Sequence, residues 1–238
     1  MTSKTATVFV PVAFGIILAL ACTVGAQSPP AGLLTKLEAE HHDFFLTQAK
    51  AGNIDIVFFG DTASEMWMWP DRGKNVWNKT FGSLKAAGFG SQGTRLESLL
   101  WRMQNGELDG YRAKLVVLQV LGVGDNALAD VGAKYADIIA EVRTRQPQAR
   151  ILIFAAFPRG FLSREAWRPI AKSNASVVAS LVDEKMVFYV DIGERFFLPD
   201  GSHNQAMWRL GTVDPGTQPP AFEVWAEELQ PWLDRFVR

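Results

Sequence analysis

The chain has little cysteine and little histidine. Its single cysteine, Cys22, lies in an amino-terminal segment that we expect to be removed, which leaves no thiol for disulfides or thiolate chemistry. Its three histidines are His41, His42 and His203, and they form neither a His-Glu-x-x-His motif nor a cluster with cysteine. The sequence therefore predicts no metal site and no bound cofactor.

The chain also lacks an excess of charge of either sign. It has 24 Lys and Arg residues against 25 Asp and Glu residues, a formal net charge of −1, and no basic stripe. Proteins that bind nucleic acids neutralise phosphates with clustered Lys and Arg side chains. We therefore expect no nucleic-acid partner, and the sequence contains no signal that fixes an oligomeric state.

The first 26 residues resemble a secretory signal. One lysine near the start precedes a short apolar run at 8–21, and Val24-Gly25-Ala26 provides small residues before Gln27. The run is short for a bilayer span and Pro11 interrupts it, so an uncleaved membrane anchor is the weaker alternative. We expect a secreted or periplasmic protein that begins at Gln27 and has no membrane attachment after cleavage.

The rest of the chain predicts one domain at 34–238 after a linker at 27–33 that contains Pro29-Pro30. Five segments read as apolar strands suited to a parallel sheet that is covered on both faces. They are Ile54–Phe59, a weaker one at Leu84–Phe89, Leu115–Leu121, Ile151–Ala155 and Met186–Ile192.

Helical patterns alternate with these strands, at 33–51, 94–104, 127–145, 164–183 and 221–237. On the first helix, we expect one face to hold Leu34, Leu37, His41, Phe45 and Ala49. Alternating strands and helices predict an α/β fold, a three-layer α/β/α sandwich with a five-stranded parallel sheet and Ile54–Phe59 near its centre. In such sheets ligands bind at the carboxyl ends of the strands.

Several of these strand ends carry the motifs of a known enzyme family. In Ile54–Trp69, an apolar strand is followed by Gly60-Asp61 and by a hydroxyl residue that opens a helix. Together with the segments below, this motif resembles the SGNH (GDSL) hydrolases, and in particular the bacterial relatives of platelet-activating-factor acetylhydrolase subunits. The resembling segments are IDIVFFGD at 54–61, KNVWNKTFGSLKAAGFG at 74–90, LLWRMQNGELDG at 99–110, TRQPQARILI at 144–153, FPRG at 157–160, VFYVDIGERF at 187–196 and VWAEELQPWL at 224–233. The resemblance implies a flavodoxin-like fold and an ester hydrolase ancestry.

The family's nucleophile position holds Thr62 instead of serine. A threonine hydroxyl can attack a carbonyl group if a base removes its proton, although its methyl group crowds the approach. Thr62 also opens a Thr-Ala-Ser-Glu sequence that is typical of a capping box, with Glu65 reaching back to the start of the helix. Capping is the favoured interpretation, catalysis is the alternative, and Ser64 is a weaker candidate nucleophile.

The second family block places Gly93 at the glycine of the oxyanion hole. A backbone N–H needs no particular side chain, so this function can survive substitution. The segment 88–93 also reads as Gly-x-Gly-x-x-Gly, but it follows a weak strand, and Glu107 lies in a polar NGELDG turn. We therefore set aside a dinucleotide-binding interpretation.

The third block is Gly-x-Asn in the family, where the Asn amide donates a hydrogen bond to the oxyanion. Here Gly124 occupies that position. Loss of one such donor typically costs about 100- to 1,000-fold in rate. Asn126 reaches the site only if the loop is shifted, and capping of the following helix is the favoured role for Asp125 or Asn126.

The last block is Asp-x-x-His, and two regions compete for it. Asp200 and His203 have the literal spacing, but His203 lies 22 residues before Trp225, whereas the family's histidine lies about nine residues before that tryptophan. That alignment places Val213 and Gly216 at the Asp and His positions. A surface turn is the favoured interpretation of Asp200 and His203, and a working base pair is the alternative.

Three functions remain open. The favoured one is a secreted, catalytically impaired esterase relative whose cleft binds a small acylated or carbohydrate ligand, with Met66–Trp69 as a candidate aromatic contact. The alternative is an altered hydrolase of acetyl or short acyl esters that uses Thr62, Gly93, Asp200 and His203. The third is a partner-binding domain, for which the sequence shows no patch. We expect His41 and His42 to be structural and away from the strand ends.

Overall fold

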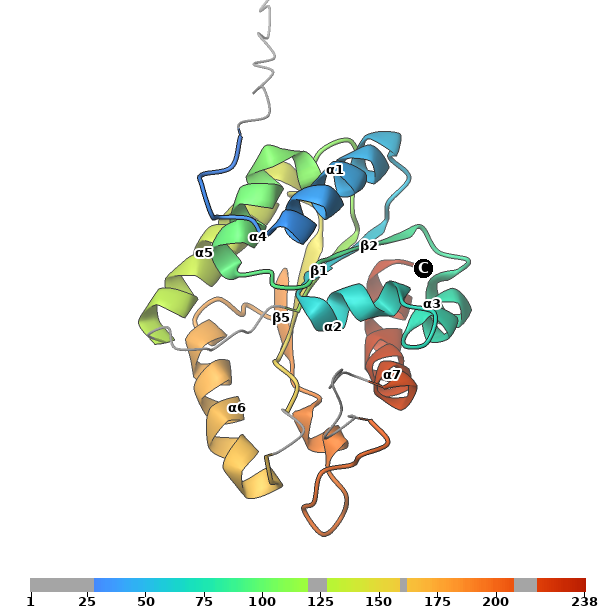
Figure 1. Ribbon diagram of the computed structural model, residues 1–238, viewed down its shortest axis with the longest axis vertical. Helices are drawn as coiled ribbons and strands as arrows, with labels where there is room; N and C mark the ends of the chain where they lie inside the picture. The colour runs from blue at the N-terminus through green and yellow to red at the C-terminus, as the bar shows by residue number, and fades with distance from the viewer. Residues whose placement is uncertain (1–27, 120–127, 159–161, 208–217) are drawn as a thin grey trace, which may run out of the picture.

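Five parallel strands form one sheet in the computed structural model, which describes residues 28–119, 128–158, 162–207 and 218–238. The strand order is β2-β1-β3-β4-β5 (Figure 1). The strands are β1 (Ile56–Gly60), β2 (Ala86–Gly90), β3 (Leu115–Gln119), β4 (Arg150–Phe154) and β5 (Val187–Val190). The predicted parallel five-stranded sheet is confirmed. The central strand is β3, and β1 lies beside it, near the centre as expected, with β2 at the edge.

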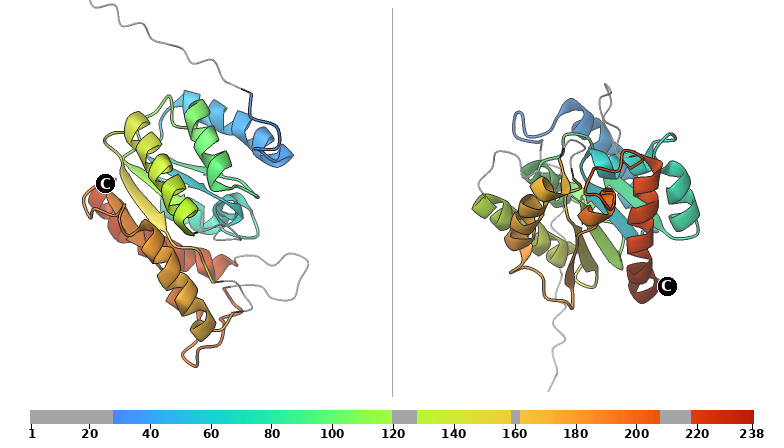
Figure 2. Two further views of the ribbon diagram at one scale, coloured as in Figure 1. Left: turned by 90° about the vertical axis from the view of Figure 1, so that its left-hand side faces the viewer. Right: turned by 90° about the horizontal axis from the view of Figure 1, so that it is seen from below.

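Helices cover both faces of this sheet, as the predicted sandwich requires (Figure 2). They are α1 (Lys36–Ala51), α2 (Thr62–Glu65), α3 (Lys74–Phe81), α4 (Leu96–Arg102), α5 (Leu128–Arg145), α6 (Arg164–Val178) and α7 (Pro219–Phe236), with short helical turns η1 (Met66–Met68), η2 (Met103–Glu107) and η3 (Gly193–Phe196). The sequence pattern did not predict α3, which is only eight residues long and lies between Gly73 and Gly82.

Alternate residues of each strand face two separate cores, because successive side chains point to opposite faces of a sheet. Val57 and Phe59 of β1 pack with α1, α4 and α5, whereas Ile56 and Phe58 pack with η1, α3 and α7. The second core is rich in aromatic rings, and the fully buried Trp67 and Trp225 lie 5.1 Å apart between ring centroids. Many of the aromatic residues therefore belong to the core.

The buried face of α1 differs from the predicted one. Phe45 and Ala49 are buried as expected, but Glu38 and His42 complete the face. Leu34 precedes the helix, which Thr35 caps through a capping box with Glu38. Polar side chains are tolerated there because each has a buried partner. Their partners are the Ser98 hydroxyl, 2.6 Å from Glu38 Oε1, and the Glu107 carboxylate, 2.8 Å from His42 Nδ1.

A buried ion pair joins α4 to η2 in this layer. Arg102 donates from Nε to Glu107 Oε1 at 2.9 Å and from Nη2 to Oε2 at 3.0 Å, and both side chains are fully buried. Arg102 also donates to the Thr94 hydroxyl and to the Phe89 carbonyl oxygen. Arg102 therefore ties α4 to the end of β2 and the loop that follows it, and Glu107, although it lies in the expected NGELDG turn, is a buried structural residue that holds Arg102 in place.

Candidate functional site

The turn from β1 into α2 is unusually tight. A Cβ on Gly60 would lie 2.0 Å from Ser64 Oγ and 2.4 Å from the Gln119 carbonyl oxygen, so only glycine fits there. The buried Ser64 hydroxyl donates to Gln119 Oε1 at 3.2 Å. Ser64 therefore fastens α2 to the end of β3, and the turn presents the next residues at the carboxyl end of β1.

Thr62 does not cap α2, contrary to the predicted capping box. The N-cap residue is Asp61, whose Oδ1 accepts a hydrogen bond from the Ala63 N–H at 3.0 Å, and Thr62 is the first helical residue. Glu65 does not reach back, because its carboxylate accepts from the Gln92 N–H at 2.5 Å and from the Trp69 indole at 3.3 Å. Thr62 is partly exposed at the carboxyl end of β1, where the nucleophile position was expected.

Asp61, next to Thr62, has an unusual acidity. Burial raises the pKa of its carboxyl group to about 6, and the Ala63 N–H only partly offsets this rise. The unfolded chain loses this proton near pH 3.8, whereas the folded chain holds it up to about pH 6. The contribution of the Asp61 carboxyl group to the free energy of unfolding is therefore present at low pH and is lost as the pH rises from about 3.8 to about 6.

We expect Asp61→Asn to stabilise the protein at pH 7.5 and to have little effect at pH 3.5. Asparagine can still accept the capping hydrogen bond and carries no charge. Because Asp61 keeps partial solvent exposure, we expect a gain of about 1 kcal/mol, well below the full value of the shift. Urea unfolding of both proteins at the two pH values measures it. Equal stability changes at both pH values would show that Asp61 ionises normally.

Gly93 lies at the same end of the sheet as Thr62. The two residues follow Gly60 and Gly90, which are paired in the β1–β2 register, and the Glu65–Gln92 hydrogen bond ties α2 to the loop that contains Gly93. Gly93 is exposed and has φ of +83°, a backbone conformation that favours glycine. The structure thus brings together the predicted nucleophile and oxyanion positions of the first two blocks.

Asp200 belongs to a tight turn and does not orient His203. Its Oδ1 accepts from the Ser202 N–H at 2.9 Å and from the Ser202 hydroxyl at 2.6 Å, and Gly201 has φ of +87°. These local hydrogen bonds are typical of an Asx turn. They lower the pKa of the exposed Asp200 carboxyl group, the Ser202 hydroxyl having the largest effect.

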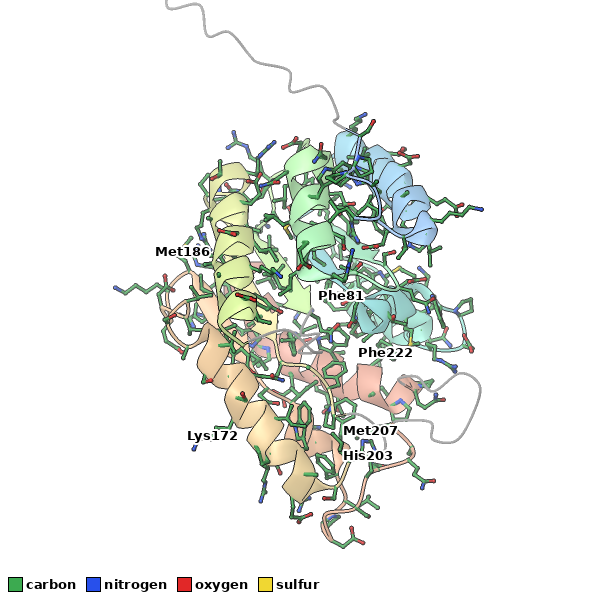
Figure 3. All side chains as sticks on the ribbon, turned by 60° about the vertical axis from the view of Figure 1, so that its left-hand side comes forward. Phe81, Lys172, Met186, His203, Met207 and Phe222 are labelled. Atoms are coloured by element: carbon green, nitrogen blue, oxygen red, sulfur yellow. The ribbon has the colours of Figure 1, made fainter. Side chains whose placement is uncertain are left out.

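His203 lies against an aromatic side chain. Its ring contacts that of Phe197 edge-on, with 5.4 Å between centroids, and its backbone forms an antiparallel bridge with the same residue. Neither ring nitrogen has a well-formed hydrogen bond within the described residues. Burial lowers the pKa of His203, and backbone groups of Pro158 and Asn204 only partly offset this. Figure 3 shows the residue below Phe222 of α7.

The remaining family positions lie outside the described residues. This applies to Gly124 and Asn126 of the third block, and to Val213 and Gly216, the aligned positions of the last block. Within the described ranges, no group of three or more His, Cys, Asp or Glu side chains is arranged to hold a metal ion.

His41 makes a contact with Ser91 that the sequence did not predict. Its Nδ1 lies 3.0 Å from the Ser91 hydroxyl, just beyond the carboxyl end of β2, so the expectation that it lies away from the strand ends is wrong. His42 is structural, as its contact with Glu107 shows. The α1 spacing put His41 on the core face, but the helix is rotated so that His42 is buried and His41 reaches the strand end.

The candidate aromatic contact at Met66–Trp69 is divided between two environments. Met66 and Trp67 are buried in the core, with exposed fractions of 3% and 0%. Met68 and Trp69 are only partly buried and line a cleft beside β2. Only the second half of the segment is therefore available to a ligand.

Comparison with known proteins agrees with this arrangement. The model of the GDSL-like lipase/acylhydrolase family matches residues 58–218. The platelet-activating factor acetylhydrolase IB subunit alpha2 of Rattus norvegicus is 30% identical over 68% of this chain and 69% of its own.

Two solved structures share the fold. One, from Streptococcus pneumonia, is described as a platelet activating factor, with TM-score 0.67, 15% identity, and 83% of this chain and 93% of that chain covered. The other is an active-site mutant of a family two carbohydrate esterase from Clostridium thermocellum, with TM-score 0.54, 14% identity, and 76% and 63% covered. The chain with its tight β1–α2 turn belongs to the GDSL-like lipase/acylhydrolase family.

Proposed function

We propose that this chain is a catalytically impaired member of its hydrolase family that binds a small acylated or carbohydrate ligand. The observation that carries the proposal is the engagement of the Asp200 carboxylate with Ser202, which leaves His203 without an orienting acid among the described residues. With Thr62 at the nucleophile position, two parts of the esterase machinery are altered together.

Ester hydrolysis by this family's chemistry needs a hydroxyl group, a base and an oxyanion hole that act as a unit. The base removes the hydroxyl proton as the oxygen attacks the carbonyl carbon, and a carboxylate fixes the imidazole in the correct orientation. Among the described residues His203 has no such carboxylate, and its polar and ring contacts there are with Phe197, Pro158 and Asn204. In addition, the methyl group of Thr62 crowds the approach of its hydroxyl oxygen to the carbonyl carbon.

The oxyanion hole also has fewer hydrogen-bond donors than the family's, which would further lower the rate of ester hydrolysis. The loop at Gly93 follows β2, and its backbone conformation suits glycine, which supports a role for the Gly93 N–H as the remaining backbone donor. By the sequence alignment, Gly124 replaces the second donor, an asparagine, at a cost of about 100- to 1,000-fold. The three losses together support impairment more strongly than any one of them, because each acts on the same transition state.

Ligand binding is supported by what the fold retains. Met68 and Trp69 line a cleft beside β2. The structural neighbour from Clostridium thermocellum is a carbohydrate esterase, which is consistent with a small carbohydrate ligand. We include secretion in the proposal because residues 1–26 have the features of a signal. None of the described helices is long and apolar enough to cross a bilayer.

One observation favours the alternative of an altered hydrolase. Backbone groups of Pro158 lie near the His203 ring, and Pro158 follows the carboxyl end of β4. His203 therefore lies toward the end of the sheet that holds the carboxyl ends of the strands, where Thr62 and Gly93 also lie. Rearrangement on substrate binding that brought His203 to Thr62 would restore a base without Asp200.

Hydrolysis of p-nitrophenyl acetate distinguishes the two functions. We expect the natural chain, without its signal, to hydrolyse this ester no faster than a Thr62→Ala, His203→Ala double variant, because neither side chain contributes to the reaction. Initial rates at pH 7.5 are measured at equal protein concentration, with circular dichroism to confirm folding. A natural rate at least about 100-fold above that of the double variant supports the altered hydrolase.

A further inference from the structure

A cleft of about 540 Å³ runs along the open edge of β2. One wall is α1, which contributes His41, Phe44 and Gln48, and the opposite wall comes from η1 and α3. In Figure 1 these elements lie on either side of β2. We call this the edge cleft. It lies beside the sheet, and neither Thr62 nor His203 lines it.

The floor of the edge cleft is formed by backbone. The Ser91 N–H donates to the Gly60 carbonyl, and the Lys85 carbonyl accepts from Asp55 and Ile56, so odd-numbered residues of this stretch face β1. Backbone groups of one residue point to the same side of a strand, and the side alternates along it. The alternation therefore turns the Gly88 N–H and C=O groups away from β1, toward the edge cleft.

Small side chains keep this edge accessible. Strand β2 reads Ala-Ala-Gly-Phe-Gly, and its only large side chain, Phe89, is stacked on Phe45 beneath α1 at 4.8 Å between centroids. The three atoms nearest to a Cβ on Gly88 would all belong to the flexible Met68 side chain, the closest being its terminal methyl carbon at 3.0 Å. Natural sheets usually cover or charge an edge strand, because its backbone pairs readily with another chain. Among the strands that the structure describes, none pairs with this edge, which lies between two walls of side chains.

The walls offer an apolar surface and one cation. Phe44 is 59% exposed, a large apolar side chain left in solvent. The Glu65 carboxylate is occupied by the Gln92 N–H and the Trp69 indole, whereas the Lys74 amine contacts Met68 Sδ at 3.7 Å and has no carboxylate partner within the described residues. Glu65 keeps its negative charge in these hydrogen bonds, so the lining holds one anion and one cation, and Lys74 is the one of the two that has no hydrogen-bonding partner other than a thioether among the described residues.

We propose that the edge cleft binds an extended polypeptide segment that pairs with β2 as a sixth strand. Backbone hydrogen bonds to Gly88 supply affinity, an apolar side chain packs on Phe44, and an acidic side chain pairs with Lys74. Two walls suit a single strand better than the edge of a second folded copy, which would meet α1. Met68 and Trp69 also line this cleft for the proposed small ligand, so a bound peptide strand and that ligand would exclude each other.

Fluorescence anisotropy with labelled nine-residue peptides tests this proposal. The peptides alternate valine and threonine, with either aspartate or lysine replacing each internal threonine in turn. We expect at least one aspartate peptide to bind about fivefold more tightly than its lysine counterpart, and Lys74→Glu to reverse that order. No binding of any peptide at millimolar concentration to the folded protein overturns the proposal.

Gly88→Pro and Gly88→Ala form a matched pair for the backbone contact. Proline removes only the N–H that faces the open edge, a position at which edge strands tolerate proline, whereas alanine keeps that N–H. We expect about tenfold weaker peptide binding for Gly88→Pro than for Gly88→Ala. Equal peptide affinities of the two variants would overturn strand pairing. It would also be overturned if the protein bound cellohexaose in a manner that depends on Trp69 but bound no peptide. Both variants leave Thr62 and His203 unchanged, so the ester assay is unaffected by this result.

Discussion

Four substitutions made together, Thr62→Ser, Gly124→Asn, Val213→Asp and Gly216→His, should raise hydrolysis of p-nitrophenyl acetate at least about 100-fold, because they restore the second oxyanion donor along with the nucleophile and base. Thr62→Ser alone should leave the rate near background. Nucleophile and base act as a unit, so restoring one without the other gains little. Initial rates of both variants and of the natural chain provide the measurement.

The matched control carries Thr62→Ala with the other three substitutions. It retains the new base and oxyanion donor but has no hydroxyl at position 62, so its rate should match that of the natural chain. If Thr62→Ser alone reaches the rate of the fourfold variant, a working base is already in place. His203 would then be that base, and the alignment of the last block at Val213 and Gly216 would be wrong.

Glu107→Gln should destabilise the protein by about 3–5 kcal/mol, because it keeps the shape of the side chain but leaves the buried Arg102 charge uncompensated. Glutamine also has one acceptor oxygen in place of two, so an amide NH2 group would face either Arg102 Nη2 or the pair formed by Arg102 Nε and His42. Urea unfolding followed by tryptophan fluorescence measures the change in the free energy of unfolding.

Asp109→Asn is the matched control for this substitution. Asp109 also pairs with an arginine, Arg145, but its side chain is 51% exposed. Solvent screens exposed ion pairs, so we expect a loss below about 1 kcal/mol. Equal losses for the two variants would show that the Arg102–Glu107 pair contributes no more than a surface ion pair.

The sequence predicted the sheet well because its strands are unambiguous. The apolar runs around Val57, Val116 and Ile151 are bounded by polar residues, and all three residues are buried in the parallel strands that were expected. A strand that is buried on both faces leaves a continuous apolar signal. The short α3 left no such signal, since its eight residues contain few apolar positions.

Local hydrogen bonding was harder to predict than the fold. Thr62 and Asp61 are both good N-cap residues, and the tight turn at Gly60 decides between them by starting the helix at Thr62. The burial of Glu107 within its polar turn could not be predicted, because its partners, Arg102 and His42, lie on other elements. Contacts of this kind depend on how the elements pack against one another. The spacing of residues along a single element does not predict that packing.

The edge cleft likewise depends on tertiary arrangement. The small residues of β2 are visible in the sequence, but only the strand order places them at an open edge between Phe44 and Trp69. The position of His41 beside Ser91 follows from the same packing of α1 along β2. The candidate nucleophile and oxyanion positions, in contrast, follow strand ends and could be located from the sequence.

Covalent trapping with a fluorophosphonate ester tests the central claim of catalytic impairment most directly, because a hydroxyl group that a base activates attacks the phosphorus rapidly and displaces fluoride. Intact mass spectrometry of the natural chain after incubation should show no adduct under conditions in which the fourfold variant is labelled at position 62. An adduct on Thr62 of the natural chain, abolished by His203→Ala, would contradict impairment and establish a working threonine–histidine pair.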